Sequence, residues 1–299
     1  MLPEEKKNDW RLYLFFALWV VLCVAVFWKP ASGVLRYALG NDNASHIVLI
    51  PFISAWLLYV EHKRIFKELK FDYAGGAVLA VLAAGAAMLT SRSFDNWTET
   101  EMLTGYTTAL VLLVIAGFVL IFGRAATKAG RFSLLFLFLM VPWPDPLLNG
   151  AIYYLQKGSA DIAEMIFDLA GVPALREGFV FRLAHLSIEV AKECSGIRSS
   201  LALLILALLV GHLFLRTFWK QVVFVVLGLV IMIVKNGIRI ATLTILAQYV
   251  DPGFLYGRLH HEGGFVFFVI GLALLLPVYW VLQRGEPRKA AAAAEAPAL

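Results

Sequence analysis

Residues 200–215 read SLALLILALLVGHLFL, an apolar run with no Asp, Glu, Lys or Arg. Such a run is typical of a helix that crosses a bilayer, because a helix satisfies its own backbone hydrogen bonds where water is absent. Further apolar segments run roughly over residues 12–28, 46–60, 74–90, 105–122, 131–141, 221–237 and 265–282. The sequence therefore predicts an all-α integral membrane protein with about eight transmembrane helices.

The composition agrees with a membrane protein. Of 299 residues, 61% are hydrophobic and 16% are charged, which is more apolar surface than one soluble core of this length can bury. The net charge of +5 comes from basic clusters between the apolar segments. We interpret these clusters as topology signals rather than as a nucleic-acid surface, so the expected partner is the lipid bilayer and no nucleic-acid partner is expected.

The basic clusters also predict an orientation. If the N-terminus is cytoplasmic, about fifteen of the 26 Lys and Arg residues fall inside, in the N-terminal tail and in the segments EHKRIFKELK, GRAATKAGR, LRTFWK and QRGEPRK. Cytoplasmic loops carry such an excess by the positive-inside rule. We therefore expect a multi-pass protein with both termini in the cytoplasm.

The longest segment assigned to the outside runs from Pro142 to about Ser199 and opens with the Pro-rich VPWPDP, which cannot continue a helix. Residues 147–171 then show helical periodicity with acidic side chains on one side, which predicts an extracytoplasmic amphipathic helix at the interface. A ninth span is the alternative, although its charges make crossing costly. Residues 172–193 alternate and are rich in Val, Ile and Phe, which indicates a short hairpin before the sixth span.

The domain organisation is simple. The chain shows no internal repeat and no second soluble domain, so we expect residues 1–289 to form a single polytopic membrane domain. Residues 290–299 are an Ala-rich, low-complexity tail that is predicted to be disordered.

Cys194 is the first candidate for chemistry, in ECSGIRSS (193–200) just before the sixth span. At the first turn of a helix the positive end of the dipole favours a thiolate, and if the helix begins near Cys194, Arg198 falls on the same face. Gly196 leaves room for close backbone approach. The alternative is that Cys194 is a small buried residue. Cys23 lies inside the first span, far along the chain, so a disulfide framework is not expected.

Arg239 is the second candidate, next to Asn236 and Gly237 in KNGIRIATL (235–243). We place it at or near the outside end of the seventh span. An always-charged guanidinium in apolar surroundings needs a partner or a function, and it could stabilise charge on a tetrahedral intermediate. The alternative is an anchor that snorkels to the interface.

His260 and His261 are the third candidates, in LHHEGGFVFF (259–268) before the last span. A histidine can take a proton from a thiol and return it to a leaving amine, so Cys194, Arg239 and a histidine would together suit acyl transfer. Either histidine could instead be structural. No metal-ligand spacing and no phosphate-binding glycine loop is present in the sequence, so neither a metal nor a cofactor is expected.

These motifs resemble the exosortase/archaeosortase family. The match is specific around VAKECSGIRSS and NGIR, and the family's histidine, followed after three residues by Gly and an aromatic, corresponds to His260 rather than His261 because Gly264 and Phe265 follow it. NASHIVLIPFISAWLLY (43–59) is similar to the family's early segment and includes His46, and VPWPDPLL (141–148) occupies a familiar position. The resemblance covers most of residues 10–282, with the catalytic motifs within 188–265.

The resemblance implies a cysteine transpeptidase of the prokaryotic cytoplasmic (inner) membrane, with its active site outside. It implies Cys194 as nucleophile, Arg239 as charge stabiliser and His260 as general base and acid, and Arg198, Asn236, His261 and His46 are secondary candidates. The implied substrates are membrane-tethered proteins that end in a short motif, often Pro-Glu-Pro-like, one hydrophobic span and a basic tail. The acyl acceptor is unknown.

Two other functions are compatible with parts of the sequence. The first is a non-enzymatic membrane component, such as a transporter or a subunit for exopolysaccharide export. Transporters tend to show internal repeats and charges near the bilayer midplane, whereas the notable polar residues here cluster at one interface. The second is a membrane cysteine protease that hydrolyses without transfer, which differs only in the acceptor that reaches the thioester.

Overall fold

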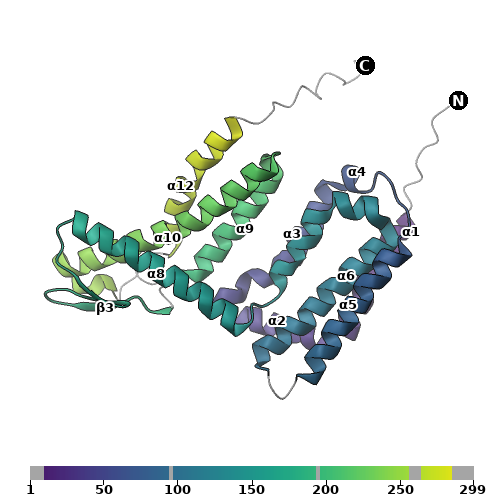
Figure 1. Cartoon of the computed structure of the whole chain (residues 1–299), viewed down its shortest axis with the longest axis horizontal. Coiled ribbons are helices and arrows are strands. Elements are labelled where there is room, and N and C mark those ends of the chain that lie inside the picture. The colour runs from purple at the N-terminus through teal and green to yellow at the C-terminus, as the bar shows by residue number, and fades with distance from the viewer. Residues whose placement is uncertain (1–9, 94–96, 193–195, 256–263, 285–299) are drawn as a thin grey trace. The chain divides into compact units, whose positions relative to one another are not determined.

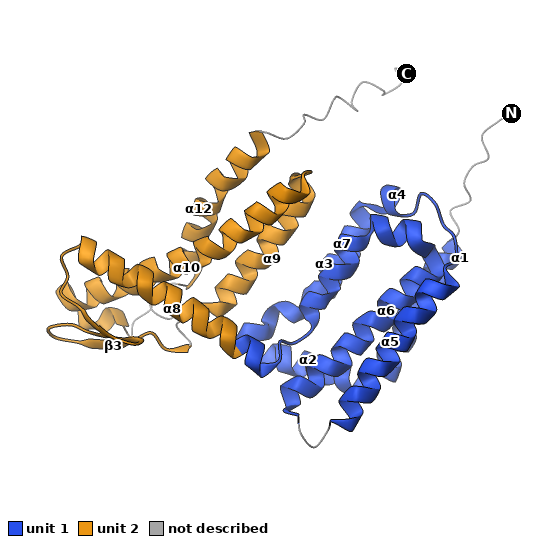
Figure 2. Cartoon of the chain, in the orientation of Figure 1, with its two compact units in different colours: residues 1–148 blue, residues 149–299 orange. Residues whose placement is uncertain are grey.

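The structure is a computed structural model that describes residues 10–93, 97–192, 196–255 and 264–284 (Figure 1). The chain divides into two compact units, residues 1–148 and 149–299 (Figure 2). Each unit is described by itself. The prediction of a single polytopic domain over residues 1–289 stays a prediction, and the tail 290–299 lies outside the described residues.

Unit 1 is helical. Its elements are α1 Trp10–Val26, α2 Trp28–Gly40, η1 Asp42–Val48, α3 Ile50–Val60, α4 His62–Ile65, α5 Tyr73–Arg92, α6 Glu99–Ala129, α7 Arg131–Phe136 and η2 Leu137–Met140. α5 and α6 lie side by side (Figure 1). Phe118 and Phe122 of α6 are fully buried and meet Phe16 of α1 at ring-centroid distances of 5.5 Å each. This aromatic cluster holds α1 against α6.

Two local signals fix where the long helices of unit 1 begin. Thr98 and Glu101 form a capping box at the start of α6, in which the Thr98 side chain accepts from the amide of Glu101. Asp72 caps α5 by accepting from the amide of Gly75 at 3.0 Å, and it pairs with Arg124 at 2.6 Å. The hydrogen bond from Gly75 and then the one from Arg124 hold the pKa of Asp72 below its usual value.

Unit 2 combines long helices with one small sheet. Its elements are most of α8 Asp145–Leu169, then β1 Leu175–Glu177, β2 Val180–Arg182, β3 Ser187–Glu189, α9 Ile197–Phe214, α10 Phe218–Tyr249, η4 Pro252–Leu255 and α12 Gly264–Arg284. The strands are antiparallel in the order β1-β2-β3, with Phe181 opposite Ile188. Phe181 and Val190 pack with Phe167 of α8 and Ala241 of α10 in one core. The sheet is therefore held on α8 and α10.

Six helices are long and apolar enough to span a membrane, among the described residues. Two further helix pairs, Trp10–Val26 with Trp28–Gly40 and Arg131–Met140 with Asp145–Leu169, pass the same test but bend sharply at a short break. The number of spans is eight if each bent pair is one span. The candidate spans also expose large apolar side chains, such as Phe265 at 74% and Leu276 at 63%. The prediction of an all-α integral membrane protein is confirmed.

The structure refines the segment before the sixth span. Residues 147–171 are helical almost throughout, as the periodicity predicts, and form most of α8. The expected hairpin is a three-stranded sheet, because the chain reverses direction twice after α8, first at Gly178 with a φ of 65° and then between β2 and β3. The position of α8 relative to the membrane and the sidedness of the termini stay predictions.

Candidate active site

Gly196 sets the start of α9. It is the residue before the helix and has a φ of 69° and a ψ of 20°, the left-handed conformation that glycine adopts without steric cost. A Cβ atom built here would lie 2.7 Å from Oδ1 of Asn236 and 3.5 Å from Nζ of Lys235. Both the backbone conformation and the space therefore require glycine, and the chain at Gly196 packs closely on α10.

The start of α9 changes one expectation. The helix begins at Ile197, after the left-handed Gly196, so it does not begin near Cys194. The predicted placement of Cys194 and Arg198 four residues apart on one helical face therefore does not follow, since that relation requires both residues to be helical. Arg198 lies in the first turn of α9 and is exposed.

Lys235 of α10 lies directly beside this turn, and the sequence analysis did not single it out. Its side chain is 2% exposed, and its Nζ donates a hydrogen bond to Oγ of Ser199 in α9. Ser199 in turn donates to the carbonyl oxygen of Gly196 at 3.0 Å. The signal in the sequence was a lysine inside a long apolar run, because an ionisable residue within a span is rarely accidental.

Asn236 links α10 to α8. Its side chain is 1% exposed and donates from Nδ2 to Oγ of Ser159 at 3.0 Å. Gly237 follows, and a Cβ built there would meet the Ser159 carbonyl oxygen at 3.0 Å, so the two helices approach closely. A second buried amide, Gln156, donates to the carbonyl oxygen of Val190 at 2.7 Å. These polar contacts fix α8, α10 and the chain after β3 around the start of α9.

Arg239 lies one helical turn after Lys235. Its expected place at or near the outside end of the seventh span stays a prediction, and the helix α10 itself continues for ten residues beyond it to Tyr249. The reason is that residues 240–249 remain largely apolar and that Thr244 satisfies its hydroxyl by donating to the carbonyl oxygen of Ile240 at 2.7 Å. After α10 ends at Tyr249, Pro252 begins the short 3-10 helix η4, because proline cannot continue the α-helix.

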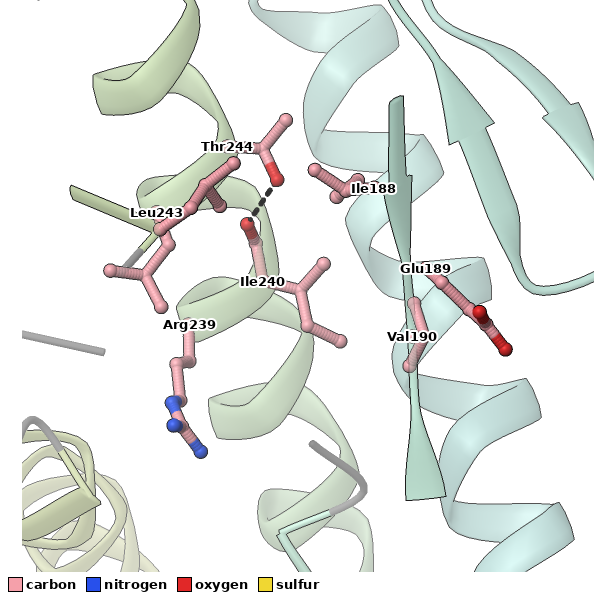
Figure 3. A pocket seen from close by; sticks show the side chains of 8 residues that line it. Ile188, Glu189, Val190, Arg239, Ile240, Leu243 and Thr244 are labelled. Atoms are coloured by element: carbon pink, nitrogen blue, oxygen red, sulfur yellow. Dashed lines mark hydrogen bonds between the residues drawn. The ribbon is translucent and has the colours of Figure 1, made fainter. Parts of the chain in front are cut away.

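A small cavity adjoins Arg239, between β3 and α10 (Figure 3). Its volume is about 50 Å³. The residues that line it are mainly aliphatic: Ile188, Glu189, Val190, Arg239, Ile240, Leu243, Thr244 and Leu255. The cavity suits a small apolar group that lies beside a guanidinium.

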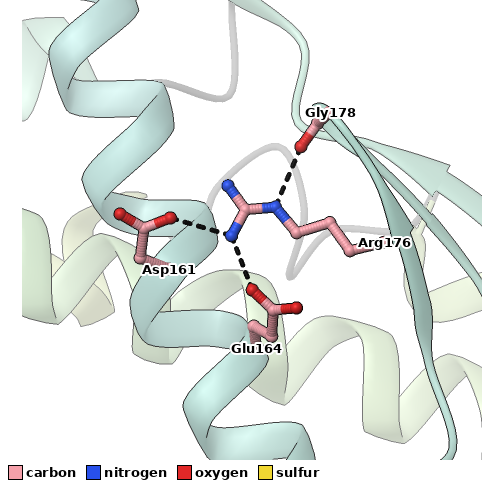
Figure 4. Close-up of polar contacts among 4 residues, drawn as sticks. All are labelled: Asp161, Glu164, Arg176 and Gly178. Atoms are coloured by element: carbon pink, nitrogen blue, oxygen red, sulfur yellow. Dashed lines mark hydrogen bonds and ion pairs between the residues drawn. The ribbon is translucent and has the colours of Figure 1, made fainter.

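The sheet beside this cavity is tied to α8 by Arg176 of β1 (Figure 4). Its Nη1 pairs with Asp161 at 2.8 Å and with Glu164 at 2.7 Å, and its Nε donates to the carbonyl oxygen of Gly178 at 2.9 Å. Burial opposes the charged form of Arg176, but the hydrogen bonds to Glu164 and Asp161 outweigh it and raise its pKa above the usual value. Asp161 and Glu164 on the acidic side of α8 thus anchor the sheet to this helix.

The other predicted site residues fall in different places. Cys194, His260 and His261 lie outside the described residues. Asn236 and Arg239 share α10, whereas His46 lies in η1 of unit 1 and is half-buried. Cys23 is a buried free thiol in α1. In the described ranges no group of three or more His, Cys, Asp or Glu residues could hold a metal, and the expectation of neither metal nor cofactor stays a prediction.

A comparison with protein-family models identifies the fold family. The model described as transmembrane exosortase matches residues 28–277. The chain belongs to the transmembrane exosortase family. The match begins with α2 and ends within α12, so it includes α8, α9 and α10, which meet at the start of α9. A search of curated proteins and a search of solved structures return no match.

Proposed function

We propose that this chain is a cysteine transpeptidase that cleaves the C-terminal sorting signals of exported proteins at the outer face of the cytoplasmic membrane. One observation supports this most directly. Gly196, two residues after Cys194 in the sequence, packs against α10 at Lys235 and Asn236, one turn from Arg239. This contact supports a site that combines Cys194 with Arg239, and the family match is independent support.

In the proposed reaction the Cys194 thiolate attacks the carbonyl carbon of the scissile peptide bond. Negative charge forms on the carbonyl oxygen, and the Arg239 guanidinium stabilises it. His260 gives a proton to the leaving nitrogen, the C–N bond breaks, and the exported protein remains bound as a thioester. A second nucleophile then attacks the thioester, loses its proton to His260 and releases the Cys194 thiolate.

The proposed substrates are tethered in the same membrane by one hydrophobic span that follows the cleaved motif and precedes a basic tail. Tethering favours a site near the membrane surface, because the scissile bond then reaches the enzyme by diffusion in two dimensions. The cavity beside Arg239, between β3 and α10, is the place where we expect an apolar side chain of the substrate motif to bind.

The nucleophile is tested by substitution at both cysteines. Cys194→Ala is expected to abolish cleavage of a co-expressed tagged substrate while the protein remains inserted and abundant, because only a thiolate forms the thioester. Cys194→Ser is expected to be severely impaired, since a hydroxyl is much less acidic. Cys23→Ala is the matched control and is expected to cleave nearly normally, because Cys23 is buried in α1. Normal processing by Cys194→Ala would end the cysteine-enzyme hypothesis.

A further inference from the structure

Unit 1 contains an apolar cavity of about 230 Å³ that no candidate catalytic residue lines. It lies between α1, α3, α6 and the segment formed by α7 and η2. Its lining side chains are apolar except that of Ser54, whose hydroxyl donates to the carbonyl oxygen of Ser133 at 2.6 Å. Because that hydroxyl already has an acceptor, the cavity offers few polar contacts to water and suits an apolar occupant.

The cavity is elongated along the helices. On α1 its lining residues are Phe16, Val20 and Val24, which recur every four positions and therefore form one stripe. Eight residues of α-helix rise about 12 Å. On α3 the lining extends in the same way from Pro51 to Leu58. The cavity thus suits a narrow linear group, and its length is close to half of a bilayer's hydrocarbon core, which is about 15 Å.

The helices around the cavity belong to candidate membrane spans. α6 is one candidate, η1 with α3 is another, and α1 and α7 each belong to one of the bent pairs. Beside such helices the surrounding medium is hydrocarbon. An empty apolar cavity is destabilising because its lining side chains lose contacts, and an acyl chain restores those contacts. A further helix of the same length needs on the order of 1000 Å³, so it does not fit.

One end of the cavity adjoins two basic segments. Leu58 is the last lining residue of α3, and its Cδ2 atom lies 3.4 Å from the position of a Cβ built on Gly130. Arg131 follows Gly130 and begins α7. Arg64 of α4 donates from Nη2 to the carbonyl oxygen of Ala129 at 2.9 Å. The segment after α3 and the segment before α7 therefore meet at this end of the cavity.

These two segments, residues 61–72 and 124–131, form a basic cluster. Together they contain seven Lys or Arg residues and three Asp or Glu residues. The side chains of Lys63, Lys128 and Arg131 are exposed. Basic residues at one end of the spans are expected from the positive-inside rule alone, but the fold adds that both segments meet beside one apolar cavity. A phosphate is attracted to such a cluster.

We propose that the cavity binds one acyl chain of an anionic phospholipid, with the phosphate of that lipid at the basic cluster of residues 61–72 and 124–131. The cavity accepts the apolar part of the lipid, and the cluster selects its charge. The bound chain fills the space between α1 and α3 and so stabilises unit 1. The proposal does not depend on the proposed function, since the lining of the cavity contains none of the candidate catalytic residues.

The first experiment measures the thermal unfolding of the full-length protein in an uncharged detergent with added phosphatidylglycerol or phosphatidylcholine of the same acyl chains. A ligand that binds the folded state raises the midpoint, so phosphatidylglycerol is expected to raise it by several degrees more than phosphatidylcholine does. Val20→Phe fills the cavity with a ring and is expected to lose most of this response. Lys128→Gln combined with Arg131→Gln is expected to lose the difference between the two lipids.

Two control variants match these changes. Val78→Phe adds the same ring on α5 at a position that is 60% exposed, and Arg36→Gln combined with Arg92→Gln removes the same charge at other exposed positions. Both controls are expected to respond to the two lipids as the unchanged protein does. Equal shifts with both lipids in the unchanged protein, or a full response in Val20→Phe, overturn the proposal. A midpoint that rises with protein concentration and not with lipid would assign the cavity to a second copy, and also overturns it.

A second experiment uses the unchanged protein, so it does not depend on how the variants fold. Phosphatidylglycerol with a diazirine in one acyl chain is added to the protein in phosphatidylcholine vesicles and irradiated. Crosslinks are expected to be several-fold more frequent on residues 16–24 and 51–58, which include the cavity lining of α1 and α3, than on α5. Phosphatidylcholine with the same diazirine is the control and is expected to show no such preference. If the two lipids label the same positions equally, the proposal is wrong.

Discussion

At the scale of single residues, the proposed site depends on the different chemistry of its two cations. Lys235 is buried and presents a compact ammonium to the turn at Gly196, whereas Arg239 is half-buried and adjoins the cavity at β3. A guanidinium is always charged and offers a planar fork of donors, so it suits an oxyanion whose position changes little during the reaction. The two positions are therefore not expected to tolerate the same substitutions.

Arg239 and the two histidines are tested with single variants and a co-expressed tagged substrate. Arg239→Lys is expected to restore little activity, with a loss on the order of 10²-fold or more, because the oxyanion donor loses its geometry. His260→Ala is expected to cost roughly 10²–10⁴-fold, and His261→Ala much less. An inactive His261→Ala together with an active His260→Ala would show that the histidine assignment is wrong.

At the scale of elements, the start of α9 is set by Gly196 and not by a side-chain cap. The left-handed turn lets the chain arrive close to α10 and then enter a long apolar helix. α10 is in turn held on α8 by the contact of Asn236 with Ser159 and by the close approach of α8 to Gly237. The turn at Gly196 thus both begins α9 and forms part of the candidate site.

Gly196→Ala tests this element boundary. A non-glycine residue in the left-handed region costs about 1–2 kcal/mol, and the new Cβ would in addition lie 2.7 Å from Oδ1 of Asn236. The variant is expected to unfold more easily in detergent and to lose most cleavage activity. Gly171→Ala is the matched control, since Gly171 has a φ of 67° with nothing within 4 Å of a built Cβ. It reports the backbone cost alone, and equal losses in both variants would contradict a specific role for the contact with Asn236.

At the scale of the whole molecule, the proposed mechanism depends on which side of the membrane each segment faces. The basic clusters predict that residues 61–70 face the cytoplasm and that residues 142–199 and 239–264 face outside. The proposed function requires the start of α9 to be outside, where exported substrates are processed. The distribution of Lys and Arg therefore bears directly on the mechanism.

Cysteine labelling tests the sidedness in a background without Cys23 and Cys194. Intact cells are treated with a maleimide that reaches the outer surface of the cytoplasmic membrane but does not cross it. This reagent is expected to label Ser187→Cys and not Lys67→Cys. Both side chains are exposed in their units, so both variants are expected to react after the membrane is permeabilised. Labelling of both positions in intact cells would contradict the predicted topology.

The sequence by itself determined the class of the protein and the family. Runs such as 200–215 are long and uncharged, and their number gives about eight spans, because lipid permits few other structures for such segments. Motifs such as CSGIR and NGIR are local in sequence, so they identified the family without knowledge of the packing. The helix at 147–171 was equally predictable, since its periodicity is a property of adjacent residues.

Only the tertiary structure decided which of the described residues meet around the start of α9. α10 ends at Tyr249, and two apolar segments form bent helix pairs. Both features depend on packing, which hydropathy does not record. In the sequence, Lys235 is distinguished only as a lysine inside an apolar run. Its contacts with Ser199 and with the turn at Gly196, which lie 36 and 39 positions away along the chain, are visible only in the fold. Contacts of that range arise when helices pack, because each helix brings together residues that no local pattern relates.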